Sequence, residues 1–259
     1  MRSGETESST KDYKMKKKRL LLYDDGIGSV EYVEHMGSDL SVVNSARVSF
    51  GSQKEDLDDK DERLISYLIR HKHNSTLEHC LVTFRFVVPL FVRSQHHRHR
   101  TWSYNEISRR YTDLDISFYE PKEFRTQHES NRQASNQDES ANPIVAWNEK
   151  SFSEGGGLPI RASDVVKDHH KQSLDAYHSL LDAGVCREQA RGVLPQNMYT
   201  QYYGTVNLSN LIKFIELRTH EGAQWEIQKV AEACLEIATE LFPITVKAFS
   251  EMKEIEKKG

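Results

Sequence analysis

The chain has 259 residues, with 35 Lys and Arg against 39 Asp and Glu, which gives a formal net charge of -4. This balance argues against wholesale nucleic-acid binding, which needs a net basic face, and no apolar run approaches the ~20 residues of a membrane-spanning helix. The 3 cysteines are widely spaced and odd in number, so we expect a reducing, cytoplasmic setting and no disulfide framework.

Residues 1–18 mix acidic side chains with a basic run and lack the apolar core of a signal peptide. We interpret them as a disordered tail, followed by a single domain over residues 19–259. The hydrophobic pattern then predicts strands and helices in alternation through the first half of the chain. These elements are strands at Arg19–Tyr23 and Ser29–Val33 around an Asp25-Gly26 turn, a helix capped by Asp39, a helix at Asp58–Lys72, a strand at Leu81–Val87, and a helix from Pro89 toward His99.

The second half reads mostly as helices. From about Thr126 to Gly157 the chain is rich in Ser, Asn, Gln, Glu and Gly, which is typical of a mobile surface insert within one fold. Beyond it we expect helices at Ser163–Ala183, Arg187–Leu194, a segment capped by Asn207, Trp225–Phe242 and Pro243–Lys253, with a strand at Met198–Val206. This order predicts an α+β fold, with a central sheet and a helical C-terminal half.

A basic cluster lies in the segment Gln95–Tyr111. Between Arg93 and Arg110 the chain carries 5 arginines, 3 histidines and 1 acid. Arginine donors suit phosphate and carboxylate oxygens, and Ser108 with nearby backbone N–H groups would complete an anion cradle. A solvated basic helix face is the alternative, but apolar residues flank the cluster on both sides. We therefore predict a partly buried site for a phosphate-bearing ligand.

Other polar residues leave alternatives open. His71, His73, His79 and Glu78, with the later His96, His97 and His99, permit a metal hypothesis, but their spacing does not match a helical metal motif, so no metal is predicted. Arg191 and Arg218 follow helical segments, where arginine either reaches the surface or enters a ligand pocket. The cysteines have no convincing histidine partner, which disfavours a covalent cysteine mechanism.

The string Arg98-His99-Arg100, followed after seven residues by Ser108, resembles the signature of flavin-dependent thymidylate synthases. Further stretches match in the family's order: Ala46–Phe50, His71–His79, Ala190–Pro195 and Leu217–Glu226. The resemblance implies reductive methylation of dUMP at C5 to dTMP, with methylenetetrahydrofolate and NADPH as co-substrates and FAD as cofactor. It also implies a homotetramer with active sites between subunits, and no nucleic-acid or membrane partner.

The resemblance assigns roles residue by residue. Arg218, Ser108 and His73 would be catalytic, with Arg218 polarising the uracil ring. The flavin-binding set would be Ser49, Ser75, Glu78, Arg98, His99, Arg100, Glu106, Asn207, Ser209 and Lys213. The dUMP-binding set would be Gln95, Glu106, Ser108, Arg109, Arg110, Arg191 and Arg218. This chain departs from the family at Arg109, where glycine is common, and at Ser209 and Lys213, where some members have Arg and Asn.

Two other classes of function remain possible from residues alone. An RNA-binding module would use the Arg98–Arg110 cluster with its neighbouring aromatic residues. A metal hydrolase would be built on the histidines. The first predicts salt-dependent oligonucleotide binding without a yellow cofactor, and the second predicts a bound metal.

Overall fold

The computed structural model describes residues 18–258 except 113–114, 122, 132–134 and 148–158. The predicted tail lies outside the described residues, apart from Lys18. The Nζ of Lys18 forms ion pairs with Glu236, at 2.7 Å, and with Glu240, and its carbonyl oxygen accepts from the backbone N–H of Tyr32 at 2.9 Å. Lys18 is therefore held by the folded domain.

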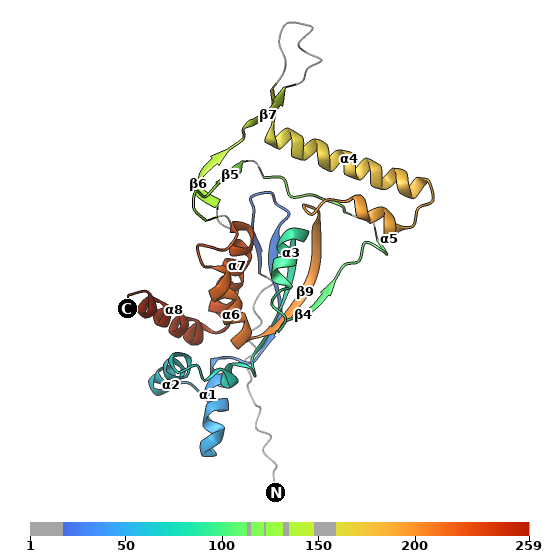
Figure 1. The fold of residues 1–259 in the computed structure, drawn as a ribbon. Coiled ribbons are helices and arrows are strands. Elements are labelled where there is room, and N and C mark those ends of the chain that lie inside the picture. The colour runs from blue at the N-terminus through green and yellow to red at the C-terminus, as the bar shows by residue number, and fades with distance from the viewer. Residues whose placement is uncertain (1–17, 113–114, 122, 132–134, 148–158, 259) are drawn as a thin grey trace.

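An antiparallel sheet of five strands lies at the centre, in the order β1-β2-β3-β9-β4 (Figure 1). The strands are β1 (Arg19–Leu21), β2 (Ser29–Met36), β3 (Leu81–Pro89), β9 (Tyr199–Asn207) and β4 (Ser103–Glu106). The predicted α+β fold is confirmed, and β4 is a strand that the sequence pattern did not predict. It brings part of the basic cluster into the sheet.

β3 lies at the middle of the sheet, between β2 and β9, and its residues alternate in burial. Its even-numbered residues Val82, Phe84, Phe86 and Val88 are fully buried, because successive side chains of a strand point to opposite faces. β3 pairs with β9 from Leu81 opposite Asn207 to Pro89 opposite Tyr199, over nine residue pairs. This long pairing fixes the start of α3, which follows β3, relative to the start of α6, which follows β9.

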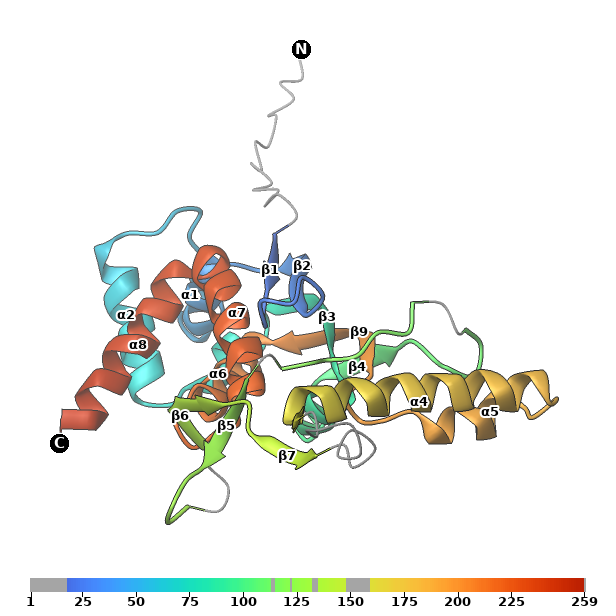
Figure 2. The same ribbon diagram turned by 90° about the horizontal axis from the view of Figure 1, so that it is seen from above.

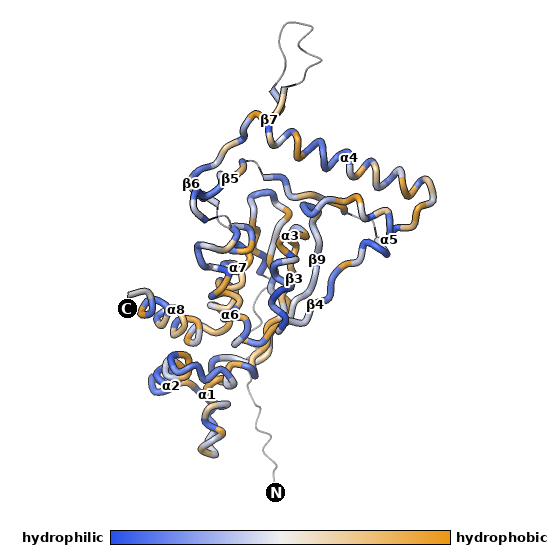
Figure 3. Tube along the Cα trace, in the orientation of Figure 1, coloured by the Kyte–Doolittle hydropathy of each residue, from blue (hydrophilic) through white to orange (hydrophobic). Residues whose placement is uncertain are grey.

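Three helices pack against the sheet and against one another: α3 (Leu90–His96), α6 (Leu208–Arg218) and α7 (Trp225–Leu241). Hydrophobic colour is concentrated along α6 and α7, whereas the β5–β6 hairpin is mostly hydrophilic (Figure 3). The Oδ1 of Asn207 accepts from the backbone N–H of Asn210 at 2.9 Å, which confirms the predicted cap of α6.

The remaining helices lie at two ends of the molecule (Figure 2). One end carries α1 (Asp39–Arg47), η1 (Val48–Phe50), α2 (Asp59–Arg70), η2 (Asn74–Leu77) and α8 (Pro243–Lys258). The other end carries α4 (Ala162–Asp182), α5 (Arg187–Ala190) and η4 (Arg191–Val193). Among the described residues, no helix is long and apolar enough to cross a membrane.

The predicted cap at Asp39 is wrong. Ser38 is the N-cap of α1, while the buried carboxylate of Asp39 accepts from the backbone N–H groups of Ile244 and Thr245 at 2.9 and 3.0 Å. The hydroxyl of Thr245 donates to the same carboxylate at 2.6 Å. Asp39 therefore satisfies N–H groups at the start of α8, which no local pattern around residue 39 indicates.

The polar insert contains strands that its composition did not predict. β5 (Phe124–Gln127) pairs with β6 (Ser135–Ala141), and β7 (Ile144–Trp147) pairs with β8 (Pro159–Arg161). Part of the predicted insert, residues 132–134 and 148–157, lies outside the described residues. Arg125 in β5 reaches back to Glu226 in α7 at 2.8 Å, so the base of the hairpin is joined to the central fold.

Candidate active site

The predicted segment Gln95–Tyr111 runs from the last turn of α3, through a turn and β4, into a tight loop. Pro89 is the N-cap of α3, where its lack of an N–H carries no cost. His96 is completely buried and its Nδ1 lies 2.8 Å from the hydroxyl of Tyr202. Burial holds the pKa of His96 well below its usual value. His96 is thus a neutral histidine of the aromatic core.

Arg218 and His99 meet at the end of α6. The Nε of Arg218 donates to Nε2 of His99 at 3.0 Å, and its Nη2 donates to the carbonyl oxygen of Gln95 at 3.4 Å. Burial, and then the neighbouring Arg218 charge, lower the pKa of His99 to about 4. His99 is consequently neutral near pH 7, with its proton on Nδ1. Across the described chain, no carboxylate pairs with Arg218, so both of its acceptors are neutral and its positive charge stays uncompensated.

Glu106 stands at the end of β4 and is tied to two neighbours. Its Oε1 accepts from Nε of Arg93 at 3.2 Å and from the hydroxyl of Thr200 at 2.6 Å. Thr200 is buried on β9, so this contact fixes the carboxylate against the sheet. Glu106 therefore offers a positioned acceptor beside α3.

A turn follows β4. The hydroxyl of Ser108 accepts from the backbone N–H of Arg110 at 3.3 Å, and its carbonyl oxygen accepts from the N–H of Tyr111 at 3.0 Å. Arg109 is buried, whereas Arg110 is exposed, with its Cζ 5.5 Å from the centre of the Tyr111 ring. Arginine at position 109 is thus accommodated inside the fold.

The remaining predicted flavin residues lie mainly on short helices at the end that carries α1. Ser49 in η1, Ser75 in η2 and Glu78 are exposed, as are Arg98 and Arg100. A cavity of about 510 Å³ opens beside η1. Its lining residues are Asn44, Ser45, Val48, Gly51, Ser52, Gln53 and His79.

Three residues of the predicted flavin set lie on β9 and α6, and they differ in whether their side-chain polar groups are left to bind a ligand. The side-chain oxygen of Asn207 is committed as the cap of α6. Ser209 is buried and its Oγ has no hydrogen-bond partner among the described residues. Lys213 is exposed. Of the three, Ser209 offers a buried donor and Lys213 an accessible cation.

Within the described chain, neither Arg191 nor His73 is hydrogen-bonded to Arg218. Arg191 is exposed on η4, where its Nε donates to the carbonyl oxygen of Glu188 at 3.3 Å. The α5 region lies under α4, away from α6, in both views (Figures 1 and 2). His73 is exposed, with its ring centre 5.9 Å from that of Tyr67 in α2.

The structure adds residues that the sequence interpretation left without a role. Glu226, only 4% exposed, accepts from Nη2 of Arg125 at 2.8 Å and from the hydroxyl of Tyr119 at 3.2 Å. The Nε2 of Gln224 donates to Glu226 at 2.9 Å, and Gln95 donates to Gln224. In the sequence, Glu226 could be noticed as a carboxylate at the start of a helix that carries an apolar stripe.

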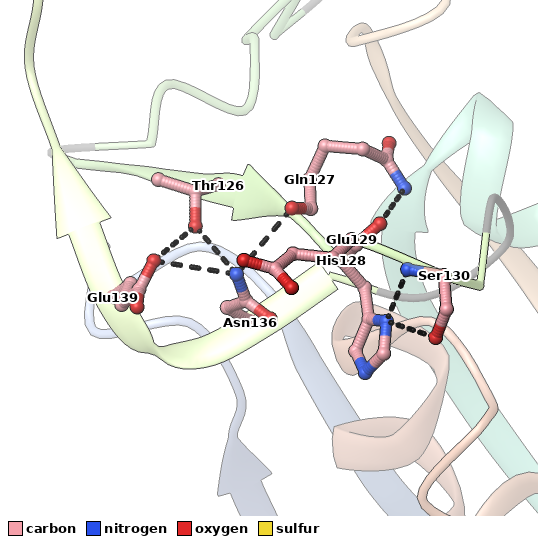
Figure 4. Close-up of a pocket in the computed structure, with 7 residues that line it drawn as sticks. All are labelled: Thr126, Gln127, His128, Glu129, Ser130, Asn136 and Glu139. Carbon is pink, nitrogen blue, oxygen red and sulfur yellow. Dashed lines mark hydrogen bonds between the residues drawn. The ribbon is translucent and has the colours of Figure 1, made fainter.

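A second cavity, of about 400 Å³, lies in the β5–β6 hairpin (Figure 4). Its side chains bond to one another: Thr126 donates to Glu139 at 2.8 Å, and Asn136 donates to Thr126 at 2.9 Å. None of the predicted site residues lines it. Among the described residues, no group of three or more His, Cys, Asp or Glu side chains is placed to hold a metal ion.

The sequence of this chain is similar to those of known proteins. The family model described as Thymidylate synthase complementing protein matches residues 31–244. The chain is 41% identical over 224 residues to the flavin-dependent thymidylate synthase of Thermus thermophilus, a match covering 86% of this chain and 76% of that protein. It is 40% identical over 222 residues to the enzyme of the same name from Thermotoga neapolitana, covering 86% and 90%.

A solved structure is similar as well. The UMP/dUMP methylase PolB from Streptomyces cacaoi, crystallised with 5-Br dUMP, superposes with a TM-score of 0.71 at 31% identity. The match covers 86% of this chain and 94% of that one. Together with the Arg98–Tyr111 signature, these matches confirm the resemblance seen in the sequence: the chain belongs to the thymidylate synthase complementing protein family, that of the flavin-dependent thymidylate synthases.

Proposed function

We propose that this protein converts dUMP to dTMP by reductive methylation at C5. Methylenetetrahydrofolate is the carbon donor, and FAD, reduced by NADPH, is the cofactor. The family membership and the similarity to a methylase crystallised with 5-Br dUMP support this reaction class. The observation that carries the proposal is the uncompensated charge of Arg218.

Arg218 suits the electrostatic demand of the reaction. Addition at the pyrimidine ring places negative charge on the ring carbonyl oxygens, and a fixed cation stabilises that charge without reorganising. Arg218 is fixed by His99 and by the carbonyl oxygen of Gln95, and neither acceptor is charged. A carboxylate partner would offset the charge, whereas these neutral acceptors orient the guanidinium and leave its field available to the substrate.

The turn after β4 supplies the nucleotide-binding groups. Ser108, Arg109 and Arg110 bring a hydroxyl, backbone N–H groups and guanidinium donors together in one loop. Such donors match the doubly charged phosphate of dUMP. Gln95 and Glu106 add side-chain acceptors beside the same loop, suited to the sugar and base.

The residues present also fit FAD. Exposed Arg98 and Arg100 are cationic donors suited to a diphosphate, with His99 between them in sequence. Ser49, Ser75 and Glu78 lie on or beside η1 and η2, near the 510 Å³ cavity. Ser209 adds a buried hydroxyl with no partner among the described residues, and Asn207 and Lys213 complete the set. When bound, FAD supplies the hydride, while these side chains hold and orient it.

We further propose a homotetramer in which a second copy completes each site. The family resemblance assigns Arg191 to the nucleotide, yet α5, which directly precedes it, lies away from α6 within one chain (Figure 1). Phe50 is 87% exposed and Val48 72% exposed, next to Ser49 of the flavin set. Apolar exposure beside a ligand set is typical of a subunit interface. His73 would then face the folate side of a shared site.

We place the protein in the cytoplasm, where thiols stay reduced. Cys80, Cys186 and Cys234 are all free, as expected in a reducing compartment.

Two measurements test the proposal. Purified protein should show oxidised-flavin absorbance, or gain it when FAD is added. The FAD-loaded protein should form dTMP from dUMP only when methylenetetrahydrofolate and NADPH are both present. Folded protein that takes up no flavin and binds RNA in a salt-dependent way would support the nucleic-acid alternative instead.

A further inference from the structure

A buried carboxylate is linked by hydrogen bonds to Gln95 of the proposed nucleotide site. Glu226 is in the first turn of α7, where the helix dipole favours a negative charge. Nη2 of Arg125 lies 2.8 and 3.0 Å from its two oxygens, and the Cζ of Arg125 is 5.3 Å from the centre of the Trp225 ring. Arg125 belongs to β5, so the β5–β6 hairpin supplies the positive charge that pairs with Glu226 of the central fold.

Two carboxamides link Glu226 to the Arg218 site. Gln224 donates through Nε2 to Oε2 of Glu226 at 2.9 Å, and its own Oε1 accepts from Nε2 of Gln95. The backbone carbonyl of Gln95 in turn holds Arg218. A continuous hydrogen-bonded path therefore runs from Arg125 to Gln95.

The direction of each carboxamide follows from the chemistry of Glu226. An ionised carboxylate only accepts hydrogen bonds, so Gln224 must turn its NH₂ group toward it. The carbonyl oxygen of Gln224 then faces Gln95, and Gln95 must donate to it through its own NH₂ group. The Oε1 of Gln95 is left over, and within the described part of the chain it has no hydrogen-bond donor.

We propose that Arg125 and Glu226 are positioning residues that fix the direction of the Gln224 and Gln95 carboxamides, so that Gln95 presents its Oε1 to a hydroxyl or ring N–H of the bound nucleotide. This inference rests on the proposed function, since it takes dUMP as the ligand. Arg125 pairs with Glu226 and holds its carboxylate in place. Glu226 determines which end of each carboxamide donates and which accepts along the path. Gln95 is the last residue of the path and the one that contacts the nucleotide.

The test exploits the polarity of the path. Gln95→Glu puts a second acceptor against the oxygen of Gln224, so dUMP affinity of the FAD-loaded protein should fall about tenfold, the usual penalty for an unmade buried hydrogen bond. Adding Glu226→Gln frees Gln224 to turn around and donate to the new carboxylate. The double variant should therefore recover most of the lost affinity, although Glu226→Gln alone does not raise affinity. Calorimetric titration with dUMP measures all four proteins.

A third substitution separates this path from simple charge balance. Gln224→Met keeps the volume of the side chain but removes both hydrogen-bonding groups. In that background the Gln95→Glu and Glu226→Gln effects on dUMP affinity should become additive, because the relay is cut. Rescue that persists without Gln224 would mean that charge compensation alone couples positions 95 and 226, and would overturn the relay.

The ligand donor can be identified with two analogues. If Gln95 accepts from the ring, wild-type protein should lose affinity for 3-methyl-dUMP, and Gln95→Met should bind dUMP and 3-methyl-dUMP alike. If Gln95 accepts from the sugar, the same pattern should appear with 2′,3′-dideoxyuridine monophosphate. Equal losses in wild type and Gln95→Met for both analogues would show that Gln95 does not contact the nucleotide, and would overturn the inference.

Failure of the inference and failure of the proposed function give different results. Wild-type protein that binds FAD but not dUMP overturns both. Wild-type protein that binds dUMP, with all variants showing additive changes in affinity, overturns only the relay. Thermal unfolding of each variant, followed by circular dichroism, distinguishes loss of binding from loss of fold. A purely structural role for Glu226 would lower the melting temperature of Glu226→Gln, and the double variant would bind dUMP no better than Gln95→Glu does.

Discussion

Arg218 donates its Nε proton to Nε2 of His99 over 3.0 Å, and this contact joins the end of α6 to the signature segment that follows α3. The two residues are 119 positions apart in the chain. Because His99 is neutral, the contact orients Arg218 without offsetting its charge. A cation that is held still and left uncompensated is what the proposed reaction requires.

Arg218→Ala should lower kcat about 10²- to 10³-fold, the usual effect of removing one electrostatic group from an active site. The fold should survive, since Arg218 is only partly buried and contributes no core volume. Arg218→Lys is the matched control, which keeps a cation but loses the two-point orientation, and it should recover only part of the rate. Near-normal turnover in Arg218→Ala would remove the assigned role.

The pH dependence of stability follows from His99. Its pKa is about 4 in the folded chain, below the ordinary value of 6.5. Between these two values the unfolded chain binds a proton that the folded chain does not, so the free energy of unfolding should fall as the pH drops from 6.5 toward 4. Above pH 6.5 His99 is neutral in both states, and this loss of stability is absent. His96, whose pKa is also lowered, acts in the same direction.

The comparison that isolates His99 is with His99→Gln. Urea unfolding at pH 7 and pH 5 should show a larger loss of stability in wild type than in the variant, because the variant has no proton to bind at position 99. His96 is present in both proteins and cancels. Equal losses in the two proteins would mean that the pKa of His99 is not depressed in the folded state.

Asp39→Ala should destabilise the fold by about 1–2 kcal/mol or more, the typical cost of losing a helix cap. The substitution leaves the N–H groups of Ile244 and Thr245 at the start of α8 without their acceptor. Asp39→Asn, which keeps one acceptor oxygen, should lose less, and Ser38→Ala should affect only α1. Urea denaturation measures all three, and an Asp39→Ala variant as stable as wild type would contradict the assigned cap.

Much of this architecture was visible in the sequence. The alternation of Val82, Phe84 and Phe86 predicts a strand, and Asn207 predicts the start of α6 as its N-cap. Both predictions succeed because each depends only on neighbouring residues. The capping of α8 by Asp39 was missed because Ile244 and Thr245, the residues whose N–H groups it accepts from, lie 205 and 206 residues away. The β5–β6 hairpin was missed because its strands bury little apolar surface, so no hydrophobic period marks them.

The site was only partly predictable for the same reason. Arg98, Ser108 and their neighbours are found through a contiguous signature, whereas the order of contacts around Glu226 depends on the fold. Arg125 and Glu226 are 101 residues apart, and neither belongs to the signature. The burial of Arg109 likewise follows from packing.

A mixing experiment tests the shared site. Arg191→Ala and Arg218→Ala should each lose most of their activity as pure proteins. If every site takes Arg191 from one subunit and Arg218 from another, unfolding and refolding the two variants together should restore partial activity, because some sites in mixed oligomers are intact. A mixture no more active than its components would place both arginines in one subunit's site or show that subunits do not share sites.

The most direct test of the central claim is chromatographic detection of dTMP. Wild-type protein saturated with FAD should convert dUMP to dTMP in the presence of methylenetetrahydrofolate and NADPH, and omitting any one of these should abolish the product. Arg218→Ala, equally loaded with flavin, should form dTMP at least 10²-fold more slowly. Absence of dTMP from folded, flavin-loaded wild-type protein would contradict the proposed function.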